Sequence, residues 1–165
     1  MSKKYLLDAN ILIEAKRQRY PFDIVPSFWK QLKEKAKSTG QIIIIQAIYN
    51  EIKEGNDELT DWLEENKDDF IVLSEPVEEV QIAYSIMIQI LKDNKAYFED
   101  AKNVFADAAD SWLCAYGPKY GYTVVTNERY NKDSKKTIYI PNVCKEFKIE
   151  CINMLDFMRE MKFLL

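Results

Sequence analysis

Residues 4–13 read KYLLDANILI, and this stretch decides the fold of the chain because an apolar run ends in an acid and then resumes with helical spacing. Tyr5 to Leu7 are typical of a short buried strand, and the apolar residues after Asp8 recur on one side of a helix. In open α/β sheets, ligands gather outside the carboxyl ends of the strands. Asp8 therefore occupies the position where such sheets usually place their chemistry.

The rest of the chain alternates strand-like and helix-like patterns. The β-branched run at 41–45 is typical of a central strand that is buried on both faces. Further strands are expected at 70–73, 122–126 and 149–152. Helices are expected at 9–16, 27–39, 46–54, 57–66, 76–92, 98–116, with Gly117-Pro118 as the stop of the last of these, at 141–142 onward and at 155–163. This alternation predicts an α/β fold with a mostly parallel sheet.

Composition sets the broad class. The chain has 165 residues, of which 47% are hydrophobic and 30% charged, and we expect a single domain over 1–165 because no linker or repeat divides it. The longest apolar runs fall far short of the roughly 20 residues that span a bilayer. The basic start is followed by too short an apolar run for a signal peptide, so we expect a cytoplasmic protein without a membrane partner.

The chain contains no histidine and only three cysteines, none of them in a C-x-x-C pair. A Ser-His-Asp or Cys-His triad is therefore excluded, and zinc sites and disulfide frameworks are disfavoured. A net charge of −4 argues against a broad basic surface for nucleic acid, although a local basic groove remains compatible with it. Catalysis in this chain must rest on carboxylates, amines or metal ions.

Glu51 is the second acid of interest. It follows Ala47 by four residues and Ile48 by three, so helical spacing places it on their apolar face. An acid on such a face needs a cation or a donor as its partner. The alternative is an acid at a helix end that pairs with Lys53 or another nearby base.

Asp107 and Asp110 lie three residues apart in an otherwise apolar helical segment, which makes them neighbours on one face. Asp107 has an alternative role as the N-cap of a helix that begins at Ala108. Asp110 is harder to explain by capping.

Thr126-Asn127-Glu128 follows the expected strand at 122–126. It could be simple turn chemistry, but parallel strands end at the same edge of a sheet, so Glu128 can approach Asp8. Without histidine, a carboxylate-held Mg²⁺ or Mn²⁺ is the means by which such a cluster could activate water and neutralise phosphoryl charge. Clustered acids without that cation should have raised pKa values.

The order of these pieces, LLDAN at 6–10, Glu51, DSWLCA at 110–115 and VVTNE at 124–128, resembles the PIN-domain family. Residues 20–23 and 140–144 look like one bacterial PIN-like subfamily of uncharacterised small proteins. The resemblance covers nearly the whole chain and implies a Rossmann-like three-layer α/β/α sandwich. It also implies a metal-dependent endoribonuclease that hydrolyses phosphodiester bonds of single-stranded or structured RNA. Many bacterial members are toxins of toxin–antitoxin pairs.

By this resemblance, the first three acidic positions are Asp8, Glu51 and Asp110, and Asn10 and Thr126 support them. Many members place an Asp a few residues after the strand-four Thr, where this chain offers Glu128, with Asp133 farther on. Asp107 is a substitute or additional ligand. The expected cofactor is Mg²⁺ or Mn²⁺.

Two basic segments are candidates for RNA contact: Lys16, Arg17 and Arg19 beside aromatic residues, and Lys135 with Lys136. The alternatives are aromatics that pack on the domain edge and lysines that are merely solvated. The apolar helix at 82–91 could be core or could pair with a second copy, and an antitoxin protein is a further candidate partner.

Two other functions compete with the nuclease. One is a PIN-like nucleic-acid or protein-binding module that has lost catalysis. The other is a phosphotransfer enzyme built on Asp8, which is weaker because the usual Asp-x-Asp pattern reads Asp8-Ala9-Asn10 here.

Overall fold

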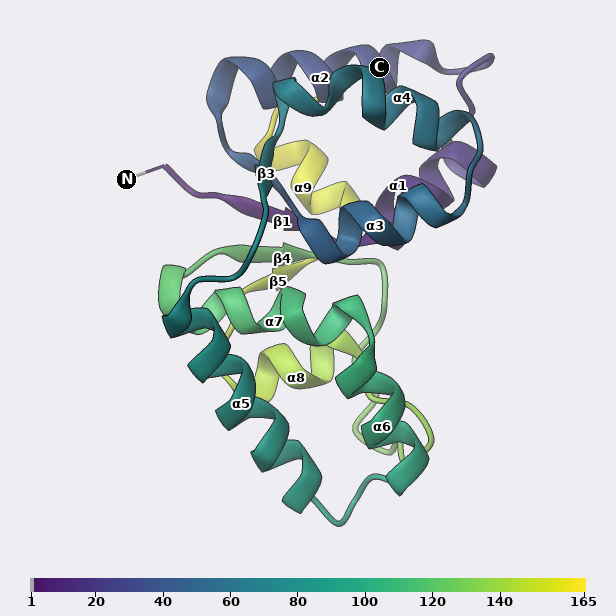
Figure 1. The fold of residues 1–165 in the computed structure, drawn as a ribbon. Helices are drawn as coiled ribbons and strands as arrows, with labels where there is room; N and C mark the ends of the chain where they lie inside the picture. The colour runs from purple at the N-terminus through teal and green to yellow at the C-terminus, as the bar shows by residue number, and fades with distance from the viewer. Residues whose placement is uncertain (1) are drawn as a thin grey trace.

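A computed structural model describes residues 2–165 and shows a five-stranded sheet at the centre of the molecule (Figure 1). The strands are β1 (Tyr5–Leu7), β2 (Ile42–Ile45), β3 (Ile71–Leu73), β4 (Thr123–Val125) and β5 (Cys151–Ile152). Their order is β3-β2-β1-β4-β5, and every pairing is parallel. The predicted strands and the predicted parallel sheet are thus confirmed.

Helices cover both faces of the sheet (Figure 1). On one face lie α1 (Ala9–Glu14), α2 (Pro26–Thr39), α3 (Gln46–Glu54), α4 (Glu58–Asn66) and α9 (Met154–Glu160). On the other lie α5 (Glu78–Asp93), α6 (Glu99–Asp107), α7 (Ala109–Tyr120) and α8 (Ile140–Glu146). The result is the expected three-layer α/β/α sandwich.

The strand order explains both the core and the position of a site. Residues Ile42 to Ile45 and Tyr5 to Leu7 are buried because helices lie over both faces of their strands. From β1 the chain moves outward through β2 and β3, then crosses back to β4 on the other side of β1. The carboxyl ends of β1 and β4 therefore flank the switch point at which open α/β sheets bind ligands.

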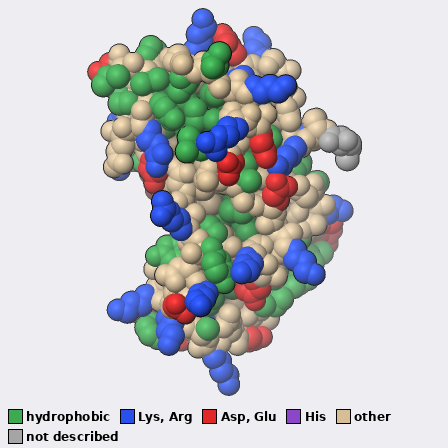
Figure 2. Space-filling view, turned by 180° about the vertical axis from the view of Figure 1, so that it is seen from behind, with side chains coloured by type: hydrophobic (Ala, Val, Ile, Leu, Met, Phe, Trp, Pro, Cys, Tyr) green, Lys and Arg blue, Asp and Glu red, His purple; other side chains and the backbone are tan. Residues whose placement is uncertain are grey.

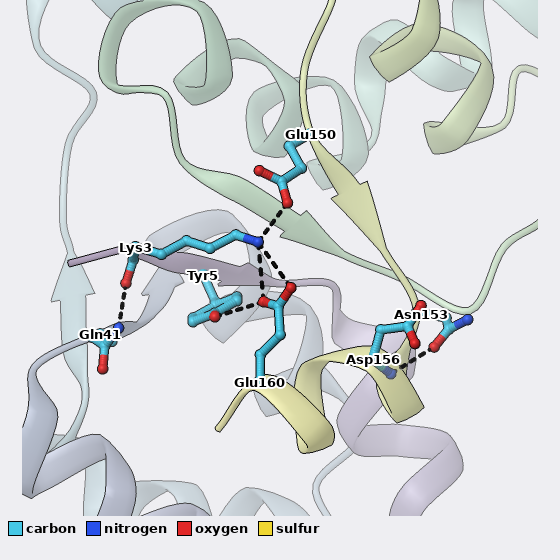
Figure 3. Close-up of polar contacts among 7 residues, drawn as sticks. All are labelled: Lys3, Tyr5, Gln41, Glu150, Asn153, Asp156 and Glu160. Atoms are coloured by element: carbon cyan, nitrogen blue, oxygen red, sulfur yellow. Dashed lines mark hydrogen bonds and ion pairs between the residues drawn. The ribbon is translucent and has the colours of Figure 1, made fainter. Parts of the chain in front are cut away.

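The opposite edge of β1 is fixed by a polar cluster (Figure 3). The hydroxyl of Tyr5 donates to Glu160 Oε2 at 2.7 Å, and Lys3 Nζ lies 3.0 Å from the same carboxylate and also pairs with Glu150. These contacts join β1 to α9 and to the start of β5, far from Asp8.

Two helix ends differ from the predictions. Helix α2 begins at Pro26, not after a Ser27 cap, because proline has the φ angle and lacks the N–H that the first helical position favours. Gly117-Pro118 does not end α7, which continues to Tyr120 and stops where Gly121 adopts a φ of 66°.

The basic loop after α1 is a π-helical turn over Ala15–Arg19, and the aromatic residues that follow it pack inward. Phe22 stacks on Trp29 with ring centroids 4.3 Å apart, and the Trp29 indole donates to the carbonyl of Tyr20 at 2.7 Å. The alternative in which these aromatics pack on the domain edge is therefore confirmed.

Helix α5 is amphipathic. Val80, Met87 and Leu91 belong to the core, whereas Ile82, Ile86 and Ile90 form an exposed stripe. None of the helices formed by residues 2–165 is long and apolar enough to cross a membrane. On the face seen in Figure 2, basic and acidic side chains are interspersed and no broad basic surface appears.

Candidate functional site

Asp8 and Thr126 form the buried centre of the site at the switch point. Asp8 lies directly after β1, and its backbone N–H donates to the carbonyl of Val125 at 3.0 Å. The hydroxyl of Thr126 donates to Asp8 Oδ2 at 2.8 Å, and both residues are buried. The same hydroxyl oxygen accepts the N–H of Glu128 at 3.1 Å. Thr126 thus connects Asp8, at the end of β1, to the backbone that follows β4.

Asp110 reaches the same edge of the sheet from α7. This helix leads into β4, so in a parallel sheet it runs against the strands and its N-terminus lies at their carboxyl edge. Asp110 is in the first turn, where the helix dipole favours an anion. Ala108 has an extended backbone with φ −87° and ψ 157°, and this break separates α6 from α7. The break sets the direction from which Asp110 enters the site.

Glu51 does not lie on the buried face of α3, contrary to the spacing argument. Ile48 and Ile52 fill that face, and Glu51 is exposed at the rim. The suggested partner Lys53 approaches Glu64 at 3.8 Å instead. Residues spaced by three and four cover a wide arc of a helix, and this arc reaches the solvent-exposed border of the apolar face. Glu51 lies at that border.

Glu128 is half-buried and points back toward the chain that follows it. Its Oε2 accepts the backbone N–H of Ile140 at 2.7 Å, at the start of α8. The other carboxylate oxygen has no protein partner among the hydrogen bonds of residues 2–165. Glu128 therefore closes the loop over 127–139 and still presents an oxygen at the sheet edge.

The four acids influence one another electrostatically. Burial and then the charge of Asp110 raise the pKa of Asp8 to about 7, although hydrogen bonds from the Thr126 hydroxyl and the Asn10 backbone N–H act in the opposite direction. Burial, then Glu128 and Glu51, raise the pKa of Asp110 to about 7. The pKa of Glu128 is also raised, chiefly by burial and then by the charge of Asp8. The pKa of Glu51 is raised by partial burial of its carboxyl group and by the charge of Glu54. Each of the four acids raises the pKa of at least one of the others, so the structure brings all four into one electrostatic cluster.

The donor chemistry of this cluster fits a hard cation. Carboxylate oxygens are the ligands that Mg²⁺ and Mn²⁺ prefer, and a cation would relieve the repulsion that raises the pKa of Asp8 and Asp110. Within residues 2–165, however, no three acid, thiol or imidazole side chains have the spacing of a closed ligand shell. The four acids thus lie in one region of the structure, but their side chains do not converge on a single metal position.

Two other predicted positions behave differently. Asp107 is the exposed last residue of α6 and does not contribute to the raised pKa of Asp110. It is also not an N-cap, because Ala108 takes that position and α7 begins at Ala109. The expectation that Asp107 shares a helix face with Asp110 is wrong because the helix is interrupted between them. Asn10 is exposed in the first turn of α1.

The basic candidates lie apart from the buried acids. Lys16 pairs with Asp57 at 3.1 Å, so it helps to fix the start of α4. Arg17 and Arg19 are exposed on the π-helical turn. Lys135 and Lys136 are exposed in the loop after β4.

Sequence reasoning missed Asn127 as a connecting residue. Its amide donates to Glu14 Oε2 at 3.1 Å, and its Oδ1 accepts the N–H of Met154 at 3.1 Å. Asn127 thereby ties α1 and the start of α9 to the end of β4. Its position next to Thr126 was the only sequence signal for this role.

Comparisons with known proteins place the chain by family and by fold. The model of a family described as Domain of unknown function (DUF4411) matches residues 5–165. No curated protein matches the chain. Among solved structures, a chain of VapBC2 from Rickettsia felis, bound to a DNA fragment from their promoter, has a similar fold. It is 18% identical with a TM-score of 0.55, and the match covers 90% of this chain and 97% of that one. The three-layer α/β/α fold is thereby confirmed.

Proposed function

This chain belongs to the DUF4411 family of domains of unknown function, and we propose that it is a divalent-metal-dependent ribonuclease of PIN type. The observation that carries the proposal is the cluster of Asp8, Glu51, Asp110 and Glu128 at the switch point of the sheet. The charges within this cluster raise the pKa values of Asp8, Asp110 and Glu128, so these acids are costly to hold together unless a cation neutralises them.

We assign the four acids to the metal and the attacking water. Asp8 and Asp110 are the inner ligands, because their carboxyls are the most strongly perturbed, each with a pKa of about 7 in the metal-free protein. Glu51 and Glu128 complete the set. Bound Mg²⁺ or Mn²⁺ would supply an activated water and neutralise charge on the phosphoryl oxygens.

The protein's own residues supply position and a proton acceptor. The Thr126 hydroxyl and the Asn10 backbone N–H orient the Asp8 carboxylate, which would bind the cation through its remaining lone pairs. A carboxylate at the rim, Glu51 or the free oxygen of Glu128, accepts the proton of the attacking water. The resulting hydroxide attacks the phosphorus, the bond to the leaving ribose oxygen breaks, and that oxygen takes up a proton from solvent.

The test is cleavage of a labelled RNA with and without Mn²⁺. We expect cleavage that needs the metal and falls at least a hundredfold in Asp8→Asn and in Asp110→Asn, on the order of the loss that follows removal of a catalytic group. Asp107→Asn is the matched control, since it removes a nearby acid outside the cluster. Cleavage that survives Asp8→Asn and Asp110→Asn would disprove the catalytic assignment.

A toxin role is the finer part of this proposal. The PIN resemblance implies it, and the likeness in fold to a chain of VapBC2 supports it. We expect that expression of the wild-type chain slows bacterial growth and that Asp8→Asn relieves this effect. The exposed stripe of Ile82, Ile86 and Ile90 on α5 offers an apolar surface for an antitoxin or a second copy.

The inactive binding module is the outcome if the metal has no effect. In that case Mn²⁺ would neither bind nor raise the melting temperature, and the open spacing of the four acids would be their functional state.

A further inference from the structure

A pocket of about 470 Å³ opens directly beside the acidic cluster. Thr126 and Glu128 stand on its wall, and the rest of the wall comes from the loop after β4, from α8 and from the β5–α9 connection. Its size is within the range of small-ligand sites. Any group bound here would lie next to the proposed cleavage centre.

The lining of the pocket combines apolar side chains with the polar groups of Thr126, Glu128 and Asp156, and it includes one aromatic and one basic residue. Cys144 and Ile149 on its wall are buried. At the mouth, Tyr130 is 47% exposed, and Lys145 Nζ lies 4.4 Å from the centre of its ring. The pocket therefore has a half-exposed aromatic ring, with a cation over one of its faces, beside a site that is otherwise acidic.

The rim is also held in place. Asn142 accepts the N–H of Asn131 at 3.0 Å and donates to the carbonyl of Asn131 at 2.7 Å. Ile140, two residues earlier, is tied to Glu128. On the far wall, Asn153 accepts the N–H of Asp156 and fixes the start of α9 (Figure 3). Tyr130 and Lys145 thus project from a braced segment.

We propose that this pocket binds a single unpaired nucleobase of the RNA, in the nucleotide next to the scissile phosphate. The inference rests on the proposed function and deepens it by assigning a base-binding subsite beside the cleavage centre. Proteins read single-stranded RNA by stacking splayed bases on aromatic rings, with cations that pair with the phosphates. A base-paired nucleotide cannot enter a pocket of this kind because its partner strand blocks the approach.

A second cavity of about 250 Å³ is less suited to this role. Trp112 and Tyr116 line it, but none of the four acids does. The ring of Trp112 is already stacked on Tyr84 at 3.8 Å, so that face is covered.

The first test is binding of adenosine and uridine 5′-monophosphates to the full-length protein, followed by NMR, with ribose 5-phosphate as the probe that lacks a base. We expect at least one nucleotide to bind about fivefold or more tightly than ribose 5-phosphate, the lower end of a base-stacking contribution. Tyr130→Ala should abolish this difference and Tyr130→Phe should keep it. Lys37→Ala, which removes an exposed lysine at the far end of α2, should leave it unchanged.

Equal binding of nucleotide and ribose 5-phosphate, or an unchanged difference in Tyr130→Ala, would overturn the proposal. A matched pair of labelled RNAs, one unpaired and one fully duplex, separates it from the proposed function. Cleavage without base-dependent binding disproves the pocket and leaves the nuclease. Base-dependent binding without cleavage of either RNA disproves the nuclease and leaves the pocket.

Discussion

At the scale of single residues, Thr126 contacts two residues of the acidic cluster. One hydroxyl donates to the buried Asp8 carboxylate and accepts the N–H of Glu128. It lowers the pKa of Asp8 against burial and the charge of Asp110. Groups that orient a metal-binding side chain commonly change affinity about 10- to 100-fold when they are removed.

We expect Thr126→Val to raise the pKa of Asp8 further and to weaken Mn²⁺ binding by about tenfold or more. The acid limb of the pH profile of RNA cleavage should then move to higher pH. At pH 8, where Asp8 is ionised, the variant should also lose about 1–3 kcal/mol of unfolding free energy, since a buried acceptor has lost its donor. Cleavage profiles and chemical denaturation measure these effects.

Thr123 is the matched control for this substitution. It lies in β4, three residues before Thr126, and is buried, but its hydroxyl has no hydrogen-bond partner within residues 2–165. Thr123→Val should therefore leave stability unchanged or increase it, with no shift in the pH profile. Equal losses in Thr123→Val and Thr126→Val would mean that the Asp8 contact has no special role.

At the scale of elements, the position of α7 decides which acid enters the site. Helix α7 can lie close to the segment that leads into β5 because Gly117 faces Ile149 in that segment. A Cβ on Gly117 would come within 2.7 Å of Ile149 Cγ2. Gly117 is thus needed because a larger side chain would not fit. It is not needed for its backbone conformation, because its φ angle is not in the left-handed region.

Gly117→Ala should destabilise the protein by about 1–3 kcal/mol, the usual cost of overpacking, although alanine favours helix formation. The Gly117→Ala/Ile149→Ala double variant should recover part of the loss relative to the sum of the two single variants, because the shortened side chain makes room for the new methyl group. Denaturant unfolding of the three variants measures this coupling. Strict additivity would show that the clash is relieved elsewhere.

At the scale of the whole molecule, holding the acids close together lowers the free energy of unfolding when they are ionised. The pKa of Asp8 rises from 3.8 to about 7, so between these values the unfolded chain binds fewer protons than the folded one. Stability must then fall as pH rises through this window. Each pKa unit corresponds to about 1.4 kcal/mol, so the expected loss is on the order of a few kcal/mol.

We expect thermal unfolding in EDTA to show a melting temperature that decreases from pH 4.5 to pH 7.5. Mn²⁺ at pH 7.5 should restore it, because a ligand that binds only the folded state stabilises that state. Asp8→Asn should flatten the pH dependence and reduce the effect of Mn²⁺. A flat profile in the wild type would show that the acids are not mutually destabilising.

Much of the fold was predictable because it depends on local patterns. Residues Tyr5 to Leu7 and Ile42 to Ile45 are apolar throughout, and only strands that are buried on both faces need such runs. The N-cap alternative for Asp107 placed a helix start at Ala108, one residue before the observed start of α7. The exact position of the break was not predictable, because the residues on both sides have helical spacing and the extended backbone of one alanine has no sequence signal. Asp107 was misplaced for that reason.

The sequence by itself determined that any catalysis here uses carboxylates, since the chain has no histidine, and that Asp8 follows a buried strand. Only the tertiary structure decided which acids join it. Crossover connections carry the ends of β1 and β4 to one edge, and the interrupted α6–α7 segment brings Asp110 there. Helical spacing could not tell the buried face of α3 from its rim, where Glu51 lies, because burial depends on what packs against a helix.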